Sequence, residues 1–182
     1  MLNPIFLLVG PPAVGKSSTS FALAKRFPLS LHIPVDKVRN MVVEGFALPK
    51  SDGNKMLLQQ VRLARISVTQ MALSYQQAGF AVVIDDFWDS QHDTDYEQLF
   101  KQTTVHRVIL CPAQAEAHQR NYQRAEPSLA RDLIDEGIRI VYQQLQPALP
   151  LLNQRGWVVL DSTHWSIHTT AEQVYQLSQR PS

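Results

Sequence analysis

The chain has 182 residues, of which 45% are hydrophobic and 18% are charged, and its formal net charge is +1. This length predicts one domain with its own core, and the balance of 17 basic against 16 acidic residues gives no electrostatic footprint for tight nucleic-acid binding. The single Cys111 excludes an internal disulfide and fits a reducing compartment, and neither a membrane-length apolar stretch nor a basic leader is visible, so we expect a cytoplasmic protein.

The first predicted elements are a strand at 5–9 and an amphipathic helix at 17–27. Between them lies Gly-Pro-Pro-Ala-Val-Gly-Lys-Ser, at residues 10–17, which follows the pattern G-x-x-x-x-G-K-[ST]. A buried strand, a glycine-rich turn and a helix are the context that this phosphate-binding loop (P-loop) requires. The sequence therefore predicts a nucleotide-binding site at the start of the chain.

Each part of this loop has a chemical role in the prediction. Glycines let the backbone wrap closely enough for several N–H groups to point at one phosphate. The helix that follows adds the partial positive charge of its N-terminus. Lys16 is expected to reach the β- and γ-phosphates, and the Ser17 hydroxyl to ligate Mg²⁺. The residues predicted to bind the nucleotide are Gly10, Ala13, Val14, Gly15, Lys16, Ser17 and Ser18.

A second strand is predicted at 29–35, followed by Asp36 and a helical pattern that runs to Gly45-Phe46; residues 47–54 read as a loop. Asp36 and Arg39 form a D-x-x-R pattern on one side of a helical turn. At a strand end facing a phosphate loop, a carboxylate is well placed to accept a proton from an attacking hydroxyl, and Arg39 to hold an anionic group. The alternative is that Asp36 caps the helix and Arg39 is solvated.

A long helix at 55–77 carries Arg62 and Arg65, which either meet an acceptor or lie on a solvated face. The next strand, at 80–84, is continuous and β-branched, as in a parallel sheet. It ends in Asp85 and Asp86, where a Walker B carboxylate would hold Mg²⁺. We expect this pair to serve the metal, and the pattern does not decide between the two residues.

The remaining pattern predicts an irregular loop at 87–95, a short helix at 96–101, a strand at 105–111 and a helix from 112 to about 124. A further helix is expected at 129–145, closed by Pro147 and Pro150, then a strand at 157–160 and a terminal helix at 170–179. Arg120 and Arg124 lie four residues apart. We predict that they belong to a small lid at about 118–132 and neutralise charge on the transferring phosphoryl group.

Five short apolar strands separated by helices predict an α/β fold in three layers, with a five-stranded parallel sheet between helices. In such a fold, ligands bind at the carboxyl ends of the strands. The polar residues expected at those ends are Lys16, Asp36, Asp85, Asp86 and Asp161.

Together the motifs give a family resemblance that covers most of the chain. The chain resembles small P-loop kinases of the AAA_33, zeta-toxin and chloramphenicol phosphotransferase type, which are related to phage polynucleotide kinase. The resemblance implies that Asp36 is the general base on the acceptor hydroxyl, that Arg39 contacts the acceptor, and that Arg120 and Arg124 are lid arginines. The matching segments are GPPAVGKSS at 10–18, VDKVR at 35–39, AVVIDDFW at 81–88, RNYQR at 120–124 and VVLDST at 158–163.

The sequence thus predicts an ATP- and Mg²⁺-dependent phosphotransferase that moves the γ-phosphoryl group to a hydroxyl of a small molecule. Two alternatives remain open. A kinase of nucleic-acid 5′-hydroxyl ends would use the same chemistry but needs a basic groove, against which the balanced charge argues. A nucleotide-dependent switch protein would bind ATP without an acceptor, and Asp36 and Arg39 would then be dispensable.

Overall fold

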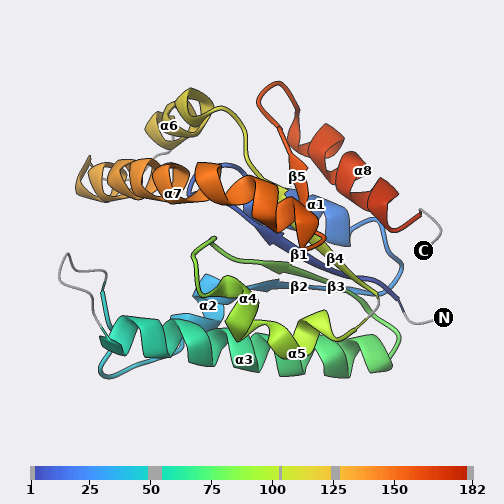
Figure 1. The fold of residues 1–182 in the computed structure, drawn as a ribbon. Coiled ribbons are helices and arrows are strands. Elements are labelled where there is room, and N and C mark those ends of the chain that lie inside the picture. The colour runs from blue at the N-terminus through green and yellow to red at the C-terminus, as the bar shows by residue number, and fades with distance from the viewer. Residues whose placement is uncertain (1–2, 49–54, 103, 124–127, 180–182) are drawn as a thin grey trace.

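The computed structural model describes residues 3–48, 55–102, 104–123 and 128–179. Its strands are β1 (Ile5–Val9), β2 (Ser30–Pro34), β3 (Ala81–Asp85), β4 (Val105–Leu110) and β5 (Val158–Leu160). They form one parallel sheet in the order β2-β3-β1-β4-β5 (Figure 1). The predicted α/β fold with a five-stranded parallel sheet flanked by helices is confirmed.

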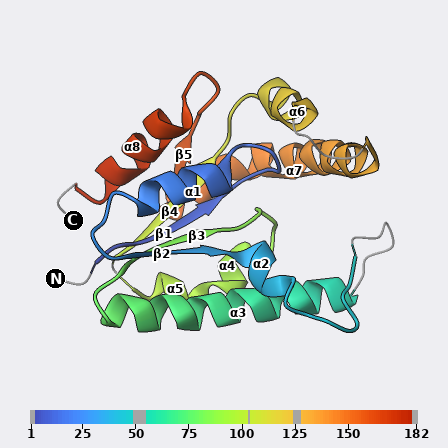
Figure 2. The same ribbon diagram turned by 180° about the vertical axis from the view of Figure 1, so that it is seen from behind.

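The helices cover both faces of this sheet (Figures 1 and 2). They are α1 (Lys16–Ala24), α2 (Val35–Arg39), α3 (Lys55–Gln77), α4 (His92–Asp95), α5 (Glu97–Phe100), α6 (Gln114–Tyr122), α7 (Ser128–Gln154) and α8 (Ile167–Leu177). The chain moves outward from β1 to β2 and then back across the sheet to β5. Because crossovers between parallel strands are right-handed, this reversal places α1 and α8 on one face and α3 and α7 on the other.

The reversal also determines where a ligand can bind. Connections leave β1 and its neighbour β3 toward opposite faces, which opens a crevice beyond the carboxyl ends of these two strands. In the register, Leu8 lies beside Asp85, so the loop after β1 and the acidic end of β3 are neighbours. The segments that the sequence marks for chemistry therefore meet at one edge of the sheet.

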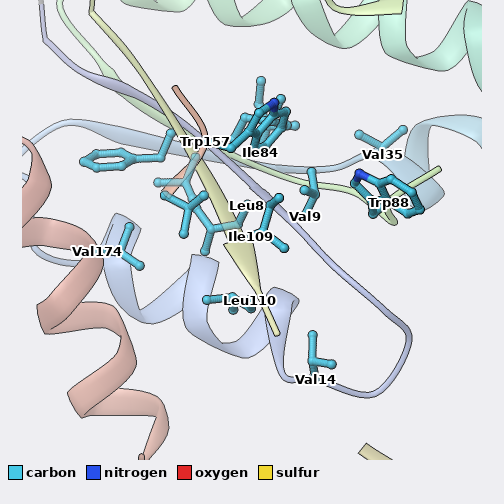
Figure 3. Close-up of a cluster of buried hydrophobic side chains, with 14 of the residues drawn as sticks. Leu8, Val9, Val14, Val35, Ile84, Trp88, Ile109, Leu110, Trp157 and Val174 are labelled. Carbon is cyan, nitrogen blue, oxygen red and sulfur yellow. The ribbon is translucent and has the colours of Figure 1, made fainter. Parts of the chain in front are cut away.

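The core lies around the two central strands, whose residues are all buried. Figure 3 shows Leu8 and Val9 of β1 beside Ile109 of β4, with Trp88 and Val14 in the same cluster. Apolar burial of this kind contributes about 25 cal/mol per Å², and here it fixes the ends of β1 and β3. The loops that follow these strands thus start from a rigid base.

Helix α7 differs from the sequence prediction. We expected a helix at 129–145 closed by Pro147 and Pro150, but α7 continues to Gln154 with both prolines inside it. The apolar face that holds buried Tyr142 and Leu145 continues past the prolines to buried Leu152, so packing outweighs the local cost of each proline. Both proline side chains are exposed, and the carbonyls that lose their N–H partners lie on a helix accessible to water.

Smaller differences occur elsewhere. The predicted loop at 87–95 contains the short helix α4, and the terminal helix begins at Ile167 rather than residue 170, because the Ser166 side chain accepts a hydrogen bond from the Thr169 N–H and caps it. Part of the predicted lid, including Arg124, lies outside the described residues. No helix in the described ranges has the length and apolar character needed to cross a membrane.

Candidate active site

The loop between β1 and α1 has the backbone conformation that its glycines allow. Gly10 has a φ of 150°, and a Cβ there would lie 2.3 Å from the Leu110 carbonyl oxygen. Gly15 has a φ of 91° at the start of α1, and Ala13 has a φ of 62°. No side chain caps α1, so its first N–H groups face the loop and can receive an anion. The backbone therefore has the features of a phosphate cradle.

Lys16 and Ser17 occupy the first turn of α1. The Lys16 Nζ donates a hydrogen bond to the Pro11 carbonyl oxygen at 2.7 Å, which folds the side chain back over the loop. The Ser17 Oγ donates to the Asp85 Oδ1 at 2.9 Å. This last contact joins the loop after β1 to the end of β3, over a separation of 68 residues. It is the arrangement expected of a P-loop serine and a Walker B carboxylate.

Asp85 and Asp86 are neighbours in the chain, but the structure separates their surroundings. Asp85 faces Ser17, whereas the Asp86 Oδ2 accepts hydrogen bonds from the Arg65 Nε at 2.7 Å and the Tyr96 hydroxyl at 3.1 Å. The Asp86 Oδ1 accepts a bond from the Phe87 N–H. The metal role of the pair remains a prediction, which we keep for Asp85, because both oxygens of Asp86 are occupied by groups of the protein.

The donor set at Asp85 suits Mg²⁺. Mg²⁺ in nucleotide sites is held by one or two hard oxygen ligands of the protein, with phosphate oxygens and water completing an octahedron. The Ser17 hydroxyl and the Asp85 carboxylate provide two such ligands within hydrogen-bond distance of each other. The described residues contain no group of three or more His, Cys, Asp or Glu side chains that could enclose a metal. An ion here would therefore depend on the nucleotide for its remaining ligands.

His32, on β2, is a neighbour of the site that sequence reasoning missed. Its Nε2 lies 2.5 Å from the Asp85 Oδ2, the oxygen that does not contact Ser17. The carboxylate is therefore held from both sides, by Ser17 through one oxygen and by His32 through the other. The only sequence signal was a polar residue inside an apolar edge strand, and such residues usually face solvent.

Arg65 lies neither in solvent nor in an acceptor pocket, which were the two expectations for it. Its side chain is fully buried and pairs with three carboxylates, those of Asp86, Asp89 and Asp95. Its Nη2 also donates to the Phe87 carbonyl oxygen at 3.3 Å. Arg65 thus ties α3 to the segment that follows β3. Arg62, the other arginine considered on this helix, is mostly exposed, and its Nε lies 3.8 Å from the Asp95 carboxylate.

The electrostatics of this cluster follow from burial. Burial raises the pKa of Asp86 to about 6, against the lowering effect of Arg65. For Arg65, burial favours the neutral form, but the charges of Asp86 and Asp89 outweigh it and raise its pKa above the ordinary value. Burial and the charge of Asp86 also raise the pKa of the Tyr96 hydroxyl, which stays protonated and donates to Asp86. The cluster is a charged support buried below the site.

Asp36 and Arg39 lie on the short helix α2, which begins directly after β2. Asp36 is exposed at the cavity described below. Arg39 donates from Nη1 to the Ala47 carbonyl oxygen at 3.0 Å, and its guanidinium lies 4.4 Å from the centre of the Phe46 ring. The Gln60 side chain bonds the backbone of the same segment. Arg39 is therefore held in position at the cavity wall.

Arg120 lies against the P-loop itself. Its Nη1 donates to the Val14 carbonyl oxygen at 3.1 Å, and its Nη2 to the Ser162 carbonyl oxygen at the same distance. Its Nε donates to Glu116. As it stands, the side chain braces the loop from the α6 side, and its action on a phosphoryl group remains a prediction. Arg124 lies outside the described residues.

A cavity of about 630 Å³ connects these groups. It is formed by the P-loop, α2, α3, the segment after β3 and the first part of α7. It brings together seven of the predicted site residues, namely Ala13, Lys16, Ser17, Asp36, Arg39, Asp85 and Asp86. The other predicted nucleotide-binding residues, Gly10, Val14 and Gly15 of the loop and Ser18 of α1, do not line the cavity. The volume is that of a typical small-molecule site.

Comparison with known proteins agrees with this geometry. The model of the AAA_33 family, an AAA domain, matches residues 5–139. No curated protein sequence matches the chain.

Several solved structures share the fold. Shikimate kinase from Acinetobacter baumannii, solved in complex with shikimate, is 18% identical with a TM-score of 0.66, over 96% of this chain and 92% of that one. A gluconokinase from Sinorhizobium meliloti 1021 is 14% identical with a TM-score of 0.63, over 98% and 95%. The tunicamycin resistance protein of Deinococcus radiodurans is 13% identical with a TM-score of 0.61, over 98% of both chains.

Proposed function

Because the chain belongs to the AAA_33 family, in which the matched region includes the P-loop and the end of β3, we propose that it is a phosphotransferase dependent on ATP and Mg²⁺. The phosphoryl acceptor is a hydroxyl group of a small molecule. The observation that carries the proposal is the Ser17–Asp85 contact at 2.9 Å, in a cavity that Asp36 also lines. In this proposal, the cavity holds the phosphates, the metal ion and the carboxylate base next to one another.

In the proposed reaction, the acceptor oxygen attacks the γ-phosphorus of ATP while the bond from that phosphorus to the β–γ bridging oxygen breaks. ADP leaves with the bridging oxygen, and the hydroxyl proton passes to the Asp36 carboxylate. Positioning and charge neutralisation supply most of the catalysis in phosphoryl transfer. Bound Mg²⁺ would supply charge neutralisation on the phosphate oxygens.

The chain's own residues have separate tasks in this scheme. Lys16 turns from the Pro11 carbonyl to the phosphates, and the N–H groups at the start of α1 hold the phosphate oxygens. Arg39 orients the acceptor from its position on Phe46. Arg120 keeps the loop in shape through the Val14 carbonyl. Asp36 acts on a hydroxyl already placed beside the phosphorus.

The test is Asp36→Asn, with ADP formation followed across sugars, nucleosides, aminoglycosides, chloramphenicol and a 5′-hydroxyl oligonucleotide. We expect acceptor-dependent turnover in the natural protein, a fall in kcat of about 10²- to 10⁴-fold in the variant, and unchanged ATP affinity. Glu97→Gln, which removes an exposed carboxylate on α5, is the matched control and should turn over normally. If Asp36→Asn turned over at the natural rate, Asp36 would not be the base, and its role would be limited to the first turn of α2.

A further inference from the structure

The cavity has walls of two chemical kinds. The P-loop, α2 and the end of β3 supply its charged groups, whereas α3 and α7 supply mainly apolar side chains. Figure 1 shows the N-terminal ends of these two long helices on the same side of the molecule as α2. The apolar lining residues outside the P-loop are Leu57, Leu58, Val61, Phe87, Leu133 and Ile134. Phosphate chemistry requires none of them.

Two of these lining residues are leucines that are largely exposed. Leu58 of α3 is 56% exposed, and Leu133 of α7 is 72% exposed. The two leucines come from different helices, lie more than seventy positions apart in the sequence and line the same space. An apolar ligand body between α3 and α7 would remove both side chains from water, which is the usual source of affinity in a small-molecule pocket.

The charges of the cavity disfavour an anionic acceptor. Its cations are Lys16 and Arg39, of which Lys16 belongs to the phosphate site. The Arg39 guanidinium already bonds the Ala47 carbonyl oxygen and lies over Phe46. Four carboxylates, those of Asp36, Asp85, Asp86 and Asp89, line the same space. Arg65 compensates two of them from below, through Asp86 and Asp89, and Asp36 is left to repel a second anion beside it.

We propose that the phosphoryl acceptor is an uncharged alcohol with an apolar ring or aliphatic body, which lies between Leu58 and Leu133 while its hydroxyl faces Asp36. This inference rests on the proposed phosphotransferase function and specifies its substrate class. Acids of the sugar type and free polyols are the classes that the site rejects. The negative charge of a sugar acid would be repelled by the carboxylates of the cavity. A polyol would leave the two leucines exposed to water and place hydroxyl groups against side chains that cannot hydrogen-bond them.

The experiment uses three defined alcohols and the full chain. The probe 2-naphthylmethanol is uncharged and fluorescent, 6-(hydroxymethyl)-2-naphthoate adds one carboxylate to the same ring, and glucose has hydroxyls without an apolar body. Binding is measured by fluorescence for the naphthalenes and by calorimetry for glucose, and transfer by ADP formation and the mass of the phosphate ester. We expect the affinity for 2-naphthylmethanol to be about tenfold or more higher than for either of the other alcohols. The kcat/KM for its phosphorylation should exceed theirs by a similar factor.

Two variants test the location. The double variant Leu58→Gln/Leu133→Gln should weaken binding of 2-naphthylmethanol about tenfold or more and leave ATP affinity unchanged. Both side chains are largely exposed, so the core stays intact. Leu63→Gln, at a 55% exposed leucine of α3 that does not line the cavity, is the control and should bind like the natural protein.

The outcomes separate this inference from the function on which it rests. Preference for the carboxylated ring or for glucose, with phosphate transferred, would overturn the inference and keep the phosphotransferase. An unaffected double variant would likewise overturn it. Binding of 2-naphthylmethanol that depends on the two leucines, with ATP bound but no phosphate transferred to any alcohol, would overturn the phosphotransferase and keep the apolar site.

Discussion

At the scale of single residues, the neighbours Asp85 and Asp86 differ in role: Asp85 is the proposed metal ligand, and Asp86 pairs with buried Arg65. Successive side chains at the end of a strand point in opposite directions, so Asp85 faces Ser17 and His32 while Asp86 faces Arg65 and Tyr96. The two carboxylates thus have different partners despite identical chemistry. Substitutions at the two positions should have different consequences, and the last prediction below uses this difference.

His92 gives a prediction about pH. Its side chain is 2% exposed, and neither ring nitrogen has a hydrogen-bond partner among the described residues. Its ring contacts those of Tyr96 and Trp157, at 5.1 Å between centroids in each case. Burial, and secondarily the charge of Arg65, lowers its pKa well below the ordinary value. Below about pH 6.5 the unfolded chain therefore binds a proton here that the folded chain does not.

Stability is consequently present above this pH and lost as the pH falls. Between pH 7.5 and 5.5, this residue should reduce the free energy of unfolding by about 1.4 kcal/mol. His92→Phe keeps the ring contacts and removes the titration, so its loss over the same interval should be smaller by that amount. Urea denaturation of both proteins at the two pH values measures the difference. Equal losses would show that folded His92 takes up the proton as readily as the unfolded chain.

At the scale of elements, α7 invites a test of its prolines. Pro147 lies in the helix interior with an exposed side chain, and it offers no N–H to the Gln143 carbonyl. Pro147→Ala restores that donor and raises helix propensity, while the more flexible unfolded chain offsets part of the gain. We expect a net stabilisation of about 1–2 kcal/mol, measured by chemical denaturation. Gln143→Ala, in the same exposed turn, should change stability by only a few tenths. A destabilised Pro147→Ala would mean that the proline ring fits its surroundings better than alanine does.

The elements also show what sequence patterns can predict. All five strands and the helix at 55–77 were predicted close to their observed bounds, because continuous apolar runs and helical periodicity report burial directly. The end of α7 was not predicted, because Pro147 is a local signal while the packing of Tyr142 and Leu152 that overrides it is tertiary. The predicted start of α8 was three residues too late. Ser166 caps this helix, and whether a serine acts as a cap depends on the backbone turn before it.

At the scale of the whole molecule, topology explains why the site could be predicted only in part. Lys16, Ser17, Asp36 and Asp85 follow strands in recognisable motifs, and a parallel sheet brings such strand ends together. The contacts of His32 with Asp85 and of Arg65 with Asp86 span 53 and 21 residues and belong to no motif. Finding them requires the strand order and the rotation of α3, which one sequence does not specify.

The last prediction concerns the stability of the whole fold when nucleotide binds. A ligand that binds only the folded chain stabilises it by about 2.7 kcal/mol at a hundred times its Kd. For a chain of this size, that corresponds to a rise in Tm of roughly 5–10 °C. We expect ATP with Mg²⁺ to produce such a rise, and ATP with a chelator to produce a smaller one. The increment due to Mg²⁺ reports the metal site formed by Ser17 and Asp85.

Asp85→Asn should abolish that increment because Asp85 is the protein's charged ligand in the proposed metal site, while the shift with ATP alone remains. Asp86→Asn should behave in the opposite way. Without nucleotide it should lose about 3 kcal/mol of stability, since Arg65 is left buried without its nearest carboxylate, yet the Mg²⁺ increment should survive. If instead Asp86→Asn removed the increment and Asp85→Asn kept it, the assignment of support and ligand would be reversed, and the metal would lie on the α3 side of β3.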